Sequence, residues 1–307
     1  EKLLEKAAAA DHATPREAAY VAALSGYYEG ASRSERERLA SYLAGWTAVH
    51  TEYPDDSEAA AFHALALLAN APAEDKSYQK QTEAGQILEG VLEQVPQHPG
   101  AHHYTIHAND FPPLAERALD IARRYDDLAP ENTHALHMTS HIFTRLGLWP
   151  ESIEFNLRAA AASADRTSTG QVSLHHLHAL DYLAYAYLQQ ADDQAADAVL
   201  AKLEALEPPF QNHSATAYAF AAVPARLALE RHDWKGALEI ESRWPAEVAW
   251  EQYPYLDAIP HFAHALGAAH LGRDNDAQQA IARLAELEEA ASQLDLAYDW
   301  GIQVAIQ

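Results

Sequence analysis

The chain of 307 residues contains no cysteine, only 12 glycines and a single methionine. Without cysteine it can form neither a disulfide framework nor a thiolate metal site. Glycine and β-branched residues are scarce and alanine is abundant, which favours helices over strands. No apolar run approaches the length of a membrane span, and no signal peptide precedes Glu1. We therefore expect a soluble helical protein of the cytoplasm or the periplasm.

Basic residues are also few. The 21 lysines and arginines are outnumbered by 45 acidic residues, which gives a formal net charge of −24 and an isoelectric point near 5.0. A surface of this sign repels nucleic acid and anionic membranes. Metal ions, cationic partners and neutral molecules are the ligands that this charge favours.

The common catalytic motifs are absent as well. The sequence has no HExxH, no GxSxG, no phosphate-binding P-loop and no GxGxxG. The glutamate base of a zincin is therefore missing, and no motif names a reaction.

Histidine, in contrast, is plentiful: there are 18, and seven of them lie within residues 96–147. Two HxxxH pairs stand out, His103/His107 and His137/His141. The interval between them is constant, since 137 − 103 = 34 and 141 − 107 = 34. Thirty-four residues is the period of the tetratricopeptide helical hairpin. The spacing predicts the same imidazole pair on the same face of two successive repeats.

Helical patterns separated by turns with proline or glycine run along the whole chain. They predict one helical-repeat superhelix over residues 1–307, with about seven hairpins. The His-bearing repeats are expected at about 97–190 and the C-terminal repeats at about 210–307. The local expectations are a single return helix over 114–129, a loop over 164–173 at the mouth of a groove, and a capping helix over 296–307.

The second His-bearing hairpin fits the tetratricopeptide consensus at positions 8, 15, 17 and 20. These positions hold Ser140, Gly147, Trp149 and Ser152. From about residue 57 to residue 290 the chain resembles the tetratricopeptide family. The resemblance implies an all-α, right-handed solenoid of helical hairpins, with a concave groove that is lined by positions 2, 5 and 9 of each repeat and holds the ligand.

In that frame three successive repeats bring polar side chains to the groove. Helix geometry agrees, because at about 100° per residue His134, His137 and His141 fall within about 60° of one another. The expected groove residues, repeat by repeat, are His103 and His107; His134, His137 and His141; and His178, Asp181 and Tyr185.

Several imidazoles and one carboxylate, without thiolate, suit Zn, Fe, Cu, Ni or Mn. We therefore predict that the groove binds a divalent transition metal together with a small or peptidic ligand. If the protein is an enzyme, the metal activates water or dioxygen, and Asp181 is the candidate general base. The predicted metal ligands are His103, His107, His137, His141, His178 and Asp181. The candidates for fixing imidazole tautomers are Tyr104, Asn156 and Tyr185.

Two alternatives stay open from the sequence. One is a non-enzymatic scaffold whose groove binds a partner protein or peptide, as tetratricopeptide arrays commonly do. The other is that the histidines are polar residues on a solvated face. His63 lies in an apolar helical pattern and is interpreted as a core residue, while His261 is a candidate to close the groove from the C-terminal end.

The strings HPGAHHYTIHA and HALHMTSHIFTRLGLW are similar to a bacterial family of tetratricopeptide-like proteins with HPGAxHxxIH and HMPSHIxxRLG signatures. Both HxxxH pairs belong to the matching residues. Thr139 stands where the family has proline, a departure that does not touch an expected ligand. No assigned reaction comes with this resemblance.

Overall fold

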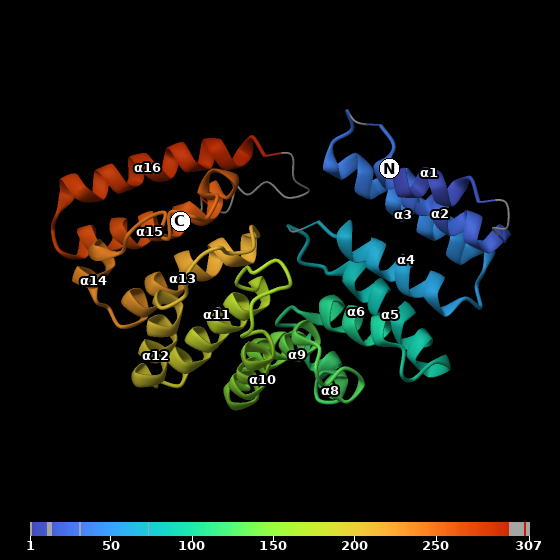
Figure 1. Cartoon of the computed structure of the whole chain (residues 1–307), viewed down its shortest axis with the longest axis horizontal. Coiled ribbons are helices and arrows are strands. Elements are labelled where there is room, and N and C mark those ends of the chain that lie inside the picture. The colour runs from blue at the N-terminus through green and yellow to red at the C-terminus, as the bar shows by residue number, and fades with distance from the viewer. Residues whose placement is uncertain (1, 11–13, 31, 73, 295–303, 305–307) are drawn as a thin grey trace. The chain divides into compact units, whose positions relative to one another are not determined.

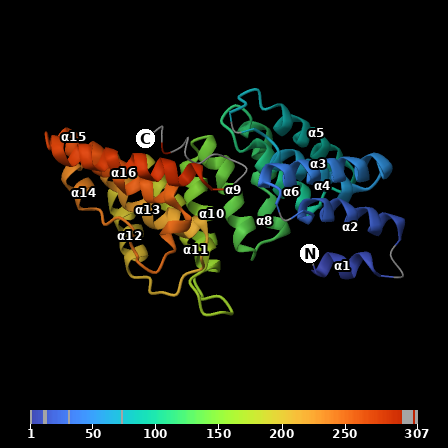
Figure 2. The same ribbon diagram turned by 90° about the horizontal axis from the view of Figure 1, so that it is seen from above.

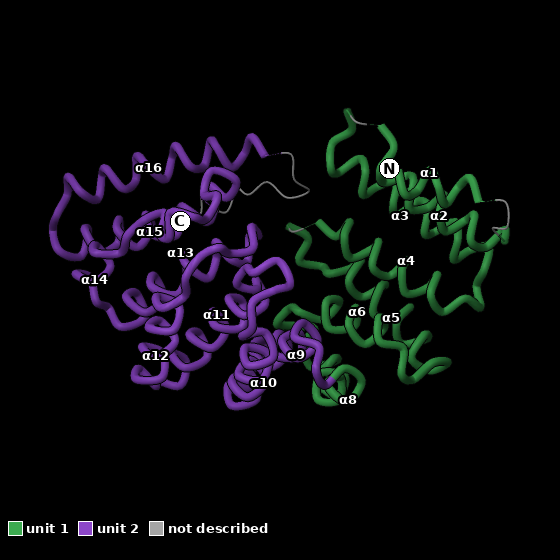
Figure 3. The backbone as a smooth tube through the Cα atoms, in the orientation of Figure 1, with its two compact units in different colours: residues 1–129, 295–298 green, residues 130–294, 299–307 purple. Residues whose placement is uncertain are grey.

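The computed structural model describes residues 2–10, 14–30, 32–72, 74–294 and 304, and these residues are mostly helical (Figure 1). They form two compact units, which Figure 3 shows in different colours. Unit 1 ends at Ala129. Unit 2 comprises Pro130–Leu294 together with Val304.

Unit 1 consists of helices that pack against their neighbours in sequence, as in α2 with α3 and α4 with α5. Its helices are α1 (Lys2–Ala8), α2 (Pro15–Tyr28), α3 (Glu35–Glu52), α4 (Ser57–Ala69), α5 (Gln79–Gln94), α6 (Pro99–Asn109), the 3-10 turn η1 (Ala115–Ala118), α7 (Leu119–Ala122) and α8 (Tyr125–Leu128).

Helices α2, α3 and α4 begin where the sequence supplies caps. Thr14 and Ser34 each form a capping box with the glutamate three residues on. In each box the hydroxyl accepts from the backbone N–H of the glutamate, and the glutamate carboxylate accepts from the backbone N–H of the capping residue. Asp56 caps α4 by accepting from the backbone of Glu58 and Ala59. The buried face of α4 is rich in alanine, which lets neighbouring helices approach closely.

The return helix expected over 114–129 is broken into η1, α7 and α8. None of the three pieces has a side-chain cap. The chain leaves helical geometry at Ala118 and again at Arg124, whose ψ angles are 4° and −3°. Three of its buried side chains are alanines, which anchor little apolar surface. The expectation of one continuous helix is therefore wrong.

Unit 2 continues the hairpin pattern, with α9 packed on α10, α11 on α12 and α15 on α16 (Figures 1 and 2). The first helices of successive hairpins also contact one another, α9 with α11, α11 with α13, and α13 with α15. The elements are α9 (Thr133–Arg145), α10 (Trp149–Ala162), α11 (Leu174–Gln189), α12 (Asp193–Glu204), α13 (Ser214–Glu230), α14 (Trp234–Glu239), the 3-10 turn η2 (Trp250–Gln252), α15 (Pro254–His270) and α16 (Asp274–Ser292).

The loop expected over 164–173 is tied to the segment that follows α12. An isolated parallel bridge joins Val172 to Phe210, with Val172 N–H donating to Pro209 O over 2.8 Å. The Arg166 guanidinium donates to Glu207 O over 2.8 Å. This bridge is the only β pairing within the described part of the chain.

The prediction of an all-α solenoid of helical hairpins is confirmed by this pairing of consecutive helices. The capping helix expected over 296–307 lies outside the described residues, apart from Val304. None of the described helices is long and apolar enough to cross a membrane.

Candidate metal centre

Helix α9 carries the better-enclosed imidazole pair. Asn132 starts the helix, because its side-chain oxygen accepts from Ala135 N–H over 3.0 Å. Gly147, with φ +69°, ends the hairpin's first half by taking the left-handed conformation that glycine adopts without strain. Between these signals His137 and His141 are one turn apart on one face.

The two imidazoles meet edge to face. Their Nε2 atoms are 3.0 Å apart, and the ring centroids are 4.9 Å apart at an interplanar angle of 81°. His137 is only 2% exposed, while His141 is partly buried and lines a cavity. The pair therefore lies at the boundary between the helix packing and an open space.

Asn156 on α10 fixes the tautomer of His137. The amide nitrogen of Asn156 donates to Ser152 O over 2.8 Å, which turns the amide oxygen toward His137. That oxygen is 2.8 Å from His137 Nδ1, and an amide oxygen can only accept. Neutral His137 is therefore protonated on Nδ1, and its Nε2 lone pair points toward His141.

A third imidazole comes from the next hairpin. His178 on α11 places its ring centroid 4.3 Å from that of His137 and 6.2 Å from that of His141. Each of the three histidines offers one ring nitrogen, and these nitrogens all lie within 4.8 Å of one another. Such a group could hold one metal ion after small shifts of the rings.

Asp181, one turn further along α11, is not placed among the imidazole nitrogens. Its Oδ1 accepts from Arg226 on α13 over 2.5 Å, and its side chain is 1% exposed. Its Oδ2 is 3.8 Å from His178 Nδ1, and neither atom has a hydrogen-bond partner among the described residues. The carboxylate thus lies beside His178 Nδ1, at a distance beyond that of a hydrogen bond.

Tyr182 lies against all three imidazoles. Its hydroxyl is 3.3 Å from His141 Nδ1, and its ring contacts those of His137 and His178 at centroid distances of 4.7 and 5.2 Å. A cavity of about 320 Å³ opens on this side. Its lining comes from α9, α11 and α13: His141, Thr144, Arg145, His178, Asp181, Tyr182, Tyr185, Tyr218 and Arg226.

Two of the three imidazoles, those of His137 and His178, are held neutral. Burial lowers the pKa of His137 well below its ordinary value, and the neighbouring imidazoles His141 and His178 lower it further. Burial also lowers the pKa of His178 to about 3. Burial raises the pKa of the Asp181 carboxyl, while the Arg226 guanidinium opposes that rise. Neutral imidazoles keep the lone pairs that a metal ion requires.

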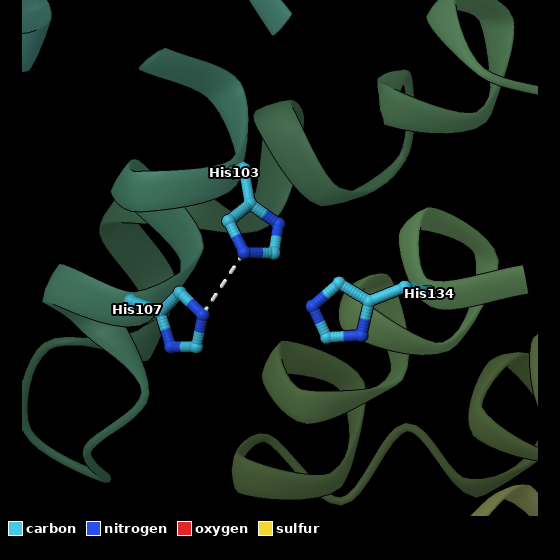
Figure 4. A group of neighbouring side chains, drawn as sticks. All are labelled: His103, His107 and His134. Atoms are coloured by element: carbon cyan, nitrogen blue, oxygen red, sulfur yellow. Dashed lines mark hydrogen bonds between the residues drawn. The ribbon is translucent and has the colours of Figure 1, made fainter. Parts of the chain in front are cut away.

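The other predicted pair, His103 and His107, lies on α6 in unit 1. Their Nε2 atoms are 3.1 Å apart. Figure 4 draws both rings and also labels His134, which comes from α9 in unit 2. The α6 rings are edge to face at 4.7 Å and 77°. Within unit 1, Tyr104 and Tyr125 contact the His103 ring.

The remaining predicted groove residues have other neighbours. His134 lies with its ring centroid 5.4 Å from that of His175 on α11. Tyr185 lines the cavity beside the cluster, with the Arg226 guanidinium 5.0 Å from its ring centroid. His63 is 8% exposed and its Nε2 lies 3.1 Å from the Thr47 hydroxyl, as for a core residue. His261 lies 3.8 Å from the buried Asp257.

Sequence reasoning missed Tyr182 and Arg226. Tyr182 could have been found, because it lies four residues after His178 and so shares its helical face. Arg226 is the only basic residue in the run AFAAVPARLALE, and a buried cation requires a paired anion. Which anion it pairs with could not be read from the sequence.

No family model matches the chain, and no curated protein matches it in sequence. In shape it is similar to a solved structure, that of Naa15/Naa10 bound to HypK-THB, with a TM-score of 0.41 and 14% identity. The match covers 91% of this chain and 38% of the other, so this chain spans well under half the length of that relative. A likeness of this degree carries no argument about ligands or partners.

Proposed function

We propose that unit 2 binds a divalent transition metal through His137, His141 and His178. The observation that carries this proposal is the convergence of three ring nitrogens within 4.8 Å, with the lone pair of His137 Nε2 directed into the cluster. In this proposal Asn156 and Asp181 are positioning residues for His137 and His178. His103 and His107 are not part of this centre.

The spacing of the α9 pair supports the proposal. Two nitrogens that bind one ion tetrahedrally at about 2.0–2.1 Å are about 3.3 Å apart. His137 Nε2 and His141 Nε2 are 3.0 Å apart, so a small adjustment of the rings fits the ion. An all-nitrogen set suits Zn²⁺, Cu²⁺, Ni²⁺ and Fe²⁺ better than Mg²⁺ or Ca²⁺.

Three protein ligands leave one position of a tetrahedral ion open, which is the pattern of catalytic rather than structural zinc sites. His141 and His178 both line the 320 Å³ cavity, so the open position is expected to face it. There the ion can bind an exogenous ligand or polarise a bound water molecule. The proposed function is therefore a helical-repeat protein with an accessible metal centre for a small molecule.

The metal content of protein purified without an affinity tag tests this proposal. We expect about one equivalent of transition metal, or tight binding of Co²⁺ by the metal-free protein with a visible spectrum of tetrahedral coordination. His141→Gln should abolish that spectrum, and His107→Gln, the matched position on α6, should leave it intact. Metal-free protein that binds neither Co²⁺ nor Zn²⁺ would exclude the proposal.

A further inference from the structure

The cavity beside the proposed metal centre contains two guanidinium groups and three phenols. Arg145 comes from the end of α9, Arg226 from α13, and the phenols are Tyr182, Tyr185 and Tyr218. At about 320 Å³ the cavity lies at the small end of the usual range for ligand pockets. A ligand there is therefore a small molecule rather than a folded partner.

The charges around the cavity favour an anion. Arg226 donates to Asp181 over 2.5 Å, so these two charges compensate each other. The three imidazoles are neutral ligands and leave the charge of a divalent ion uncompensated. Because uncompensated charge in a partly buried site is costly, the open position calls for an anionic ligand.

The shape of the lining favours an anion with an apolar body. The Arg226 guanidinium lies 5.0 Å from the Tyr185 ring centroid and 5.4 Å from that of Tyr218, and it donates to the Tyr218 hydroxyl over 2.6 Å. These contacts hold the aromatic rings in place as a wall. Rigid aromatic walls bind flat or apolar groups, while an inorganic anion gains nothing from them.

We propose that this cavity binds a small organic carboxylate with an aromatic or apolar body, whose carboxylate reaches the open metal position and lies within reach of Arg145. The inference rests on the proposed metal centre. It names the class of ligand that fills the open position of that centre.

Titration of the Co²⁺-loaded protein with benzoate tests the inference, with visible absorption as the readout. We expect a saturable spectral change. Arg145→Met should weaken benzoate binding about tenfold, as expected for the loss of one charge-assisted contact, while Co²⁺ is still bound. Arg145→Lys should recover part of the loss. Arg36→Met, at an exposed arginine of α3 in unit 1, is the matched control and should bind benzoate like the wild type.

The outcomes separate this inference from the proposed function. A Co²⁺ spectrum that benzoate does not change, or that changes equally in Arg145→Met, overturns the inference and leaves the metal centre standing. Inorganic phosphate binding more tightly than benzoate also overturns it. If Co²⁺ does not bind at all, the proposed function fails. The inference then fails with it, because it places the carboxylate on the open position of the metal.

Discussion

The two HxxxH pairs, on α6 and on α9, have nearly the same internal geometry and different surroundings. Their Nε2 atoms are 3.1 and 3.0 Å apart, and both ring pairs are edge to face. On α9, His137 is buried and Asn156 accepts from it. At the matching position of the previous repeat, since 156 − 34 = 122, the chain has Ala122, whose methyl side chain cannot accept a hydrogen bond.

The comparison shows that a spacing of four residues on a helix brings two imidazoles together, whereas a metal centre needs further groups around the pair. Residues four apart on a helix meet wherever the sequence places two histidines. A fixed tautomer, a third imidazole and a cavity are added in unit 2 by α10, α11 and α13. We therefore expect the α9 pair to be the one that responds strongly to substitution.

The largest expected effect is the loss of a metal ligand. His137→Ala should weaken Co²⁺ or Zn²⁺ binding by unit 2 at least about a hundredfold, because it removes one of three protein ligands. His103→Ala, the same position of the preceding repeat, should change that affinity less than about twofold. Competition with a chromophoric chelator measures both. Equal losses in the two variants would break the comparison.

Acidification should destabilise the folded protein, because the imidazoles of His137 and His178 are buried and neutral. The pKa of His178 falls to about 3 in the folded protein, from an ordinary value of 6.5. A lowered pKa means that the unfolded chain takes up the proton first, so stability is lost as pH falls from 6.5 toward 3. Between pH 6.5 and 5.5 His178 alone should cost about 1 kcal/mol, and His137 adds a loss in the same direction.

Urea unfolding of the metal-free protein at these two pH values measures this effect. His178→Gln cannot titrate, so its stability should fall by about 1 kcal/mol less than that of the wild type over the same interval. An identical pH dependence in the two proteins would mean that His178 is not held neutral by the fold.

A great deal of this arrangement followed from the sequence. The period of 34 residues predicted an imidazole pair on each of two successive repeats, and alignment of the third repeat predicted that His178 and Asp181 lie near them. Position within the repeat did not settle which atoms meet. His178, at position 2, joins the α9 imidazoles, whereas Asp181, at position 5, turns to Arg226. That choice depends on an ion pair between residues 45 apart, which no local pattern encodes.

The break in the 114–129 helix was beyond the sequence for a related reason. Its apolar positions repeat as they do in a helix. Helix propensity and periodicity, however, do not show that its pieces lack side-chain caps or that they bury little apolar surface. Asn156, in contrast, was predicted from the sequence as a candidate for fixing an imidazole tautomer, and its amide oxygen lies 2.8 Å from His137 Nδ1.

An intermediate effect is expected at Asn156. Asn156→Ala removes the acceptor of His137 Nδ1–H, so both tautomers become available and the metal affinity should fall about tenfold. Asn156→Asp keeps an acceptor at the same place and should restore binding of the ion, which a purely structural role would not do. If Asn156→Ala unfolds the protein, metal-dependent recovery of its helical circular dichroism still reports on the site. Full affinity in Asn156→Ala would show that the tautomer does not matter.

The smallest expected effect is at Tyr182, and it is the finest test of the comparison. The Tyr182 hydroxyl is 3.3 Å from His141 Nδ1, a long contact that contributes little more than orientation. Tyr182→Phe should therefore weaken metal binding only about two- to threefold, because the ring and its packing on three imidazoles remain. Tyr104→Phe, beside His103 on α6, is the matched control and should have no effect. A loss of a hundredfold in Tyr182→Phe would mean that the phenol itself is a ligand, and the centre would then be a three-imidazole, one-phenolate site without an open position.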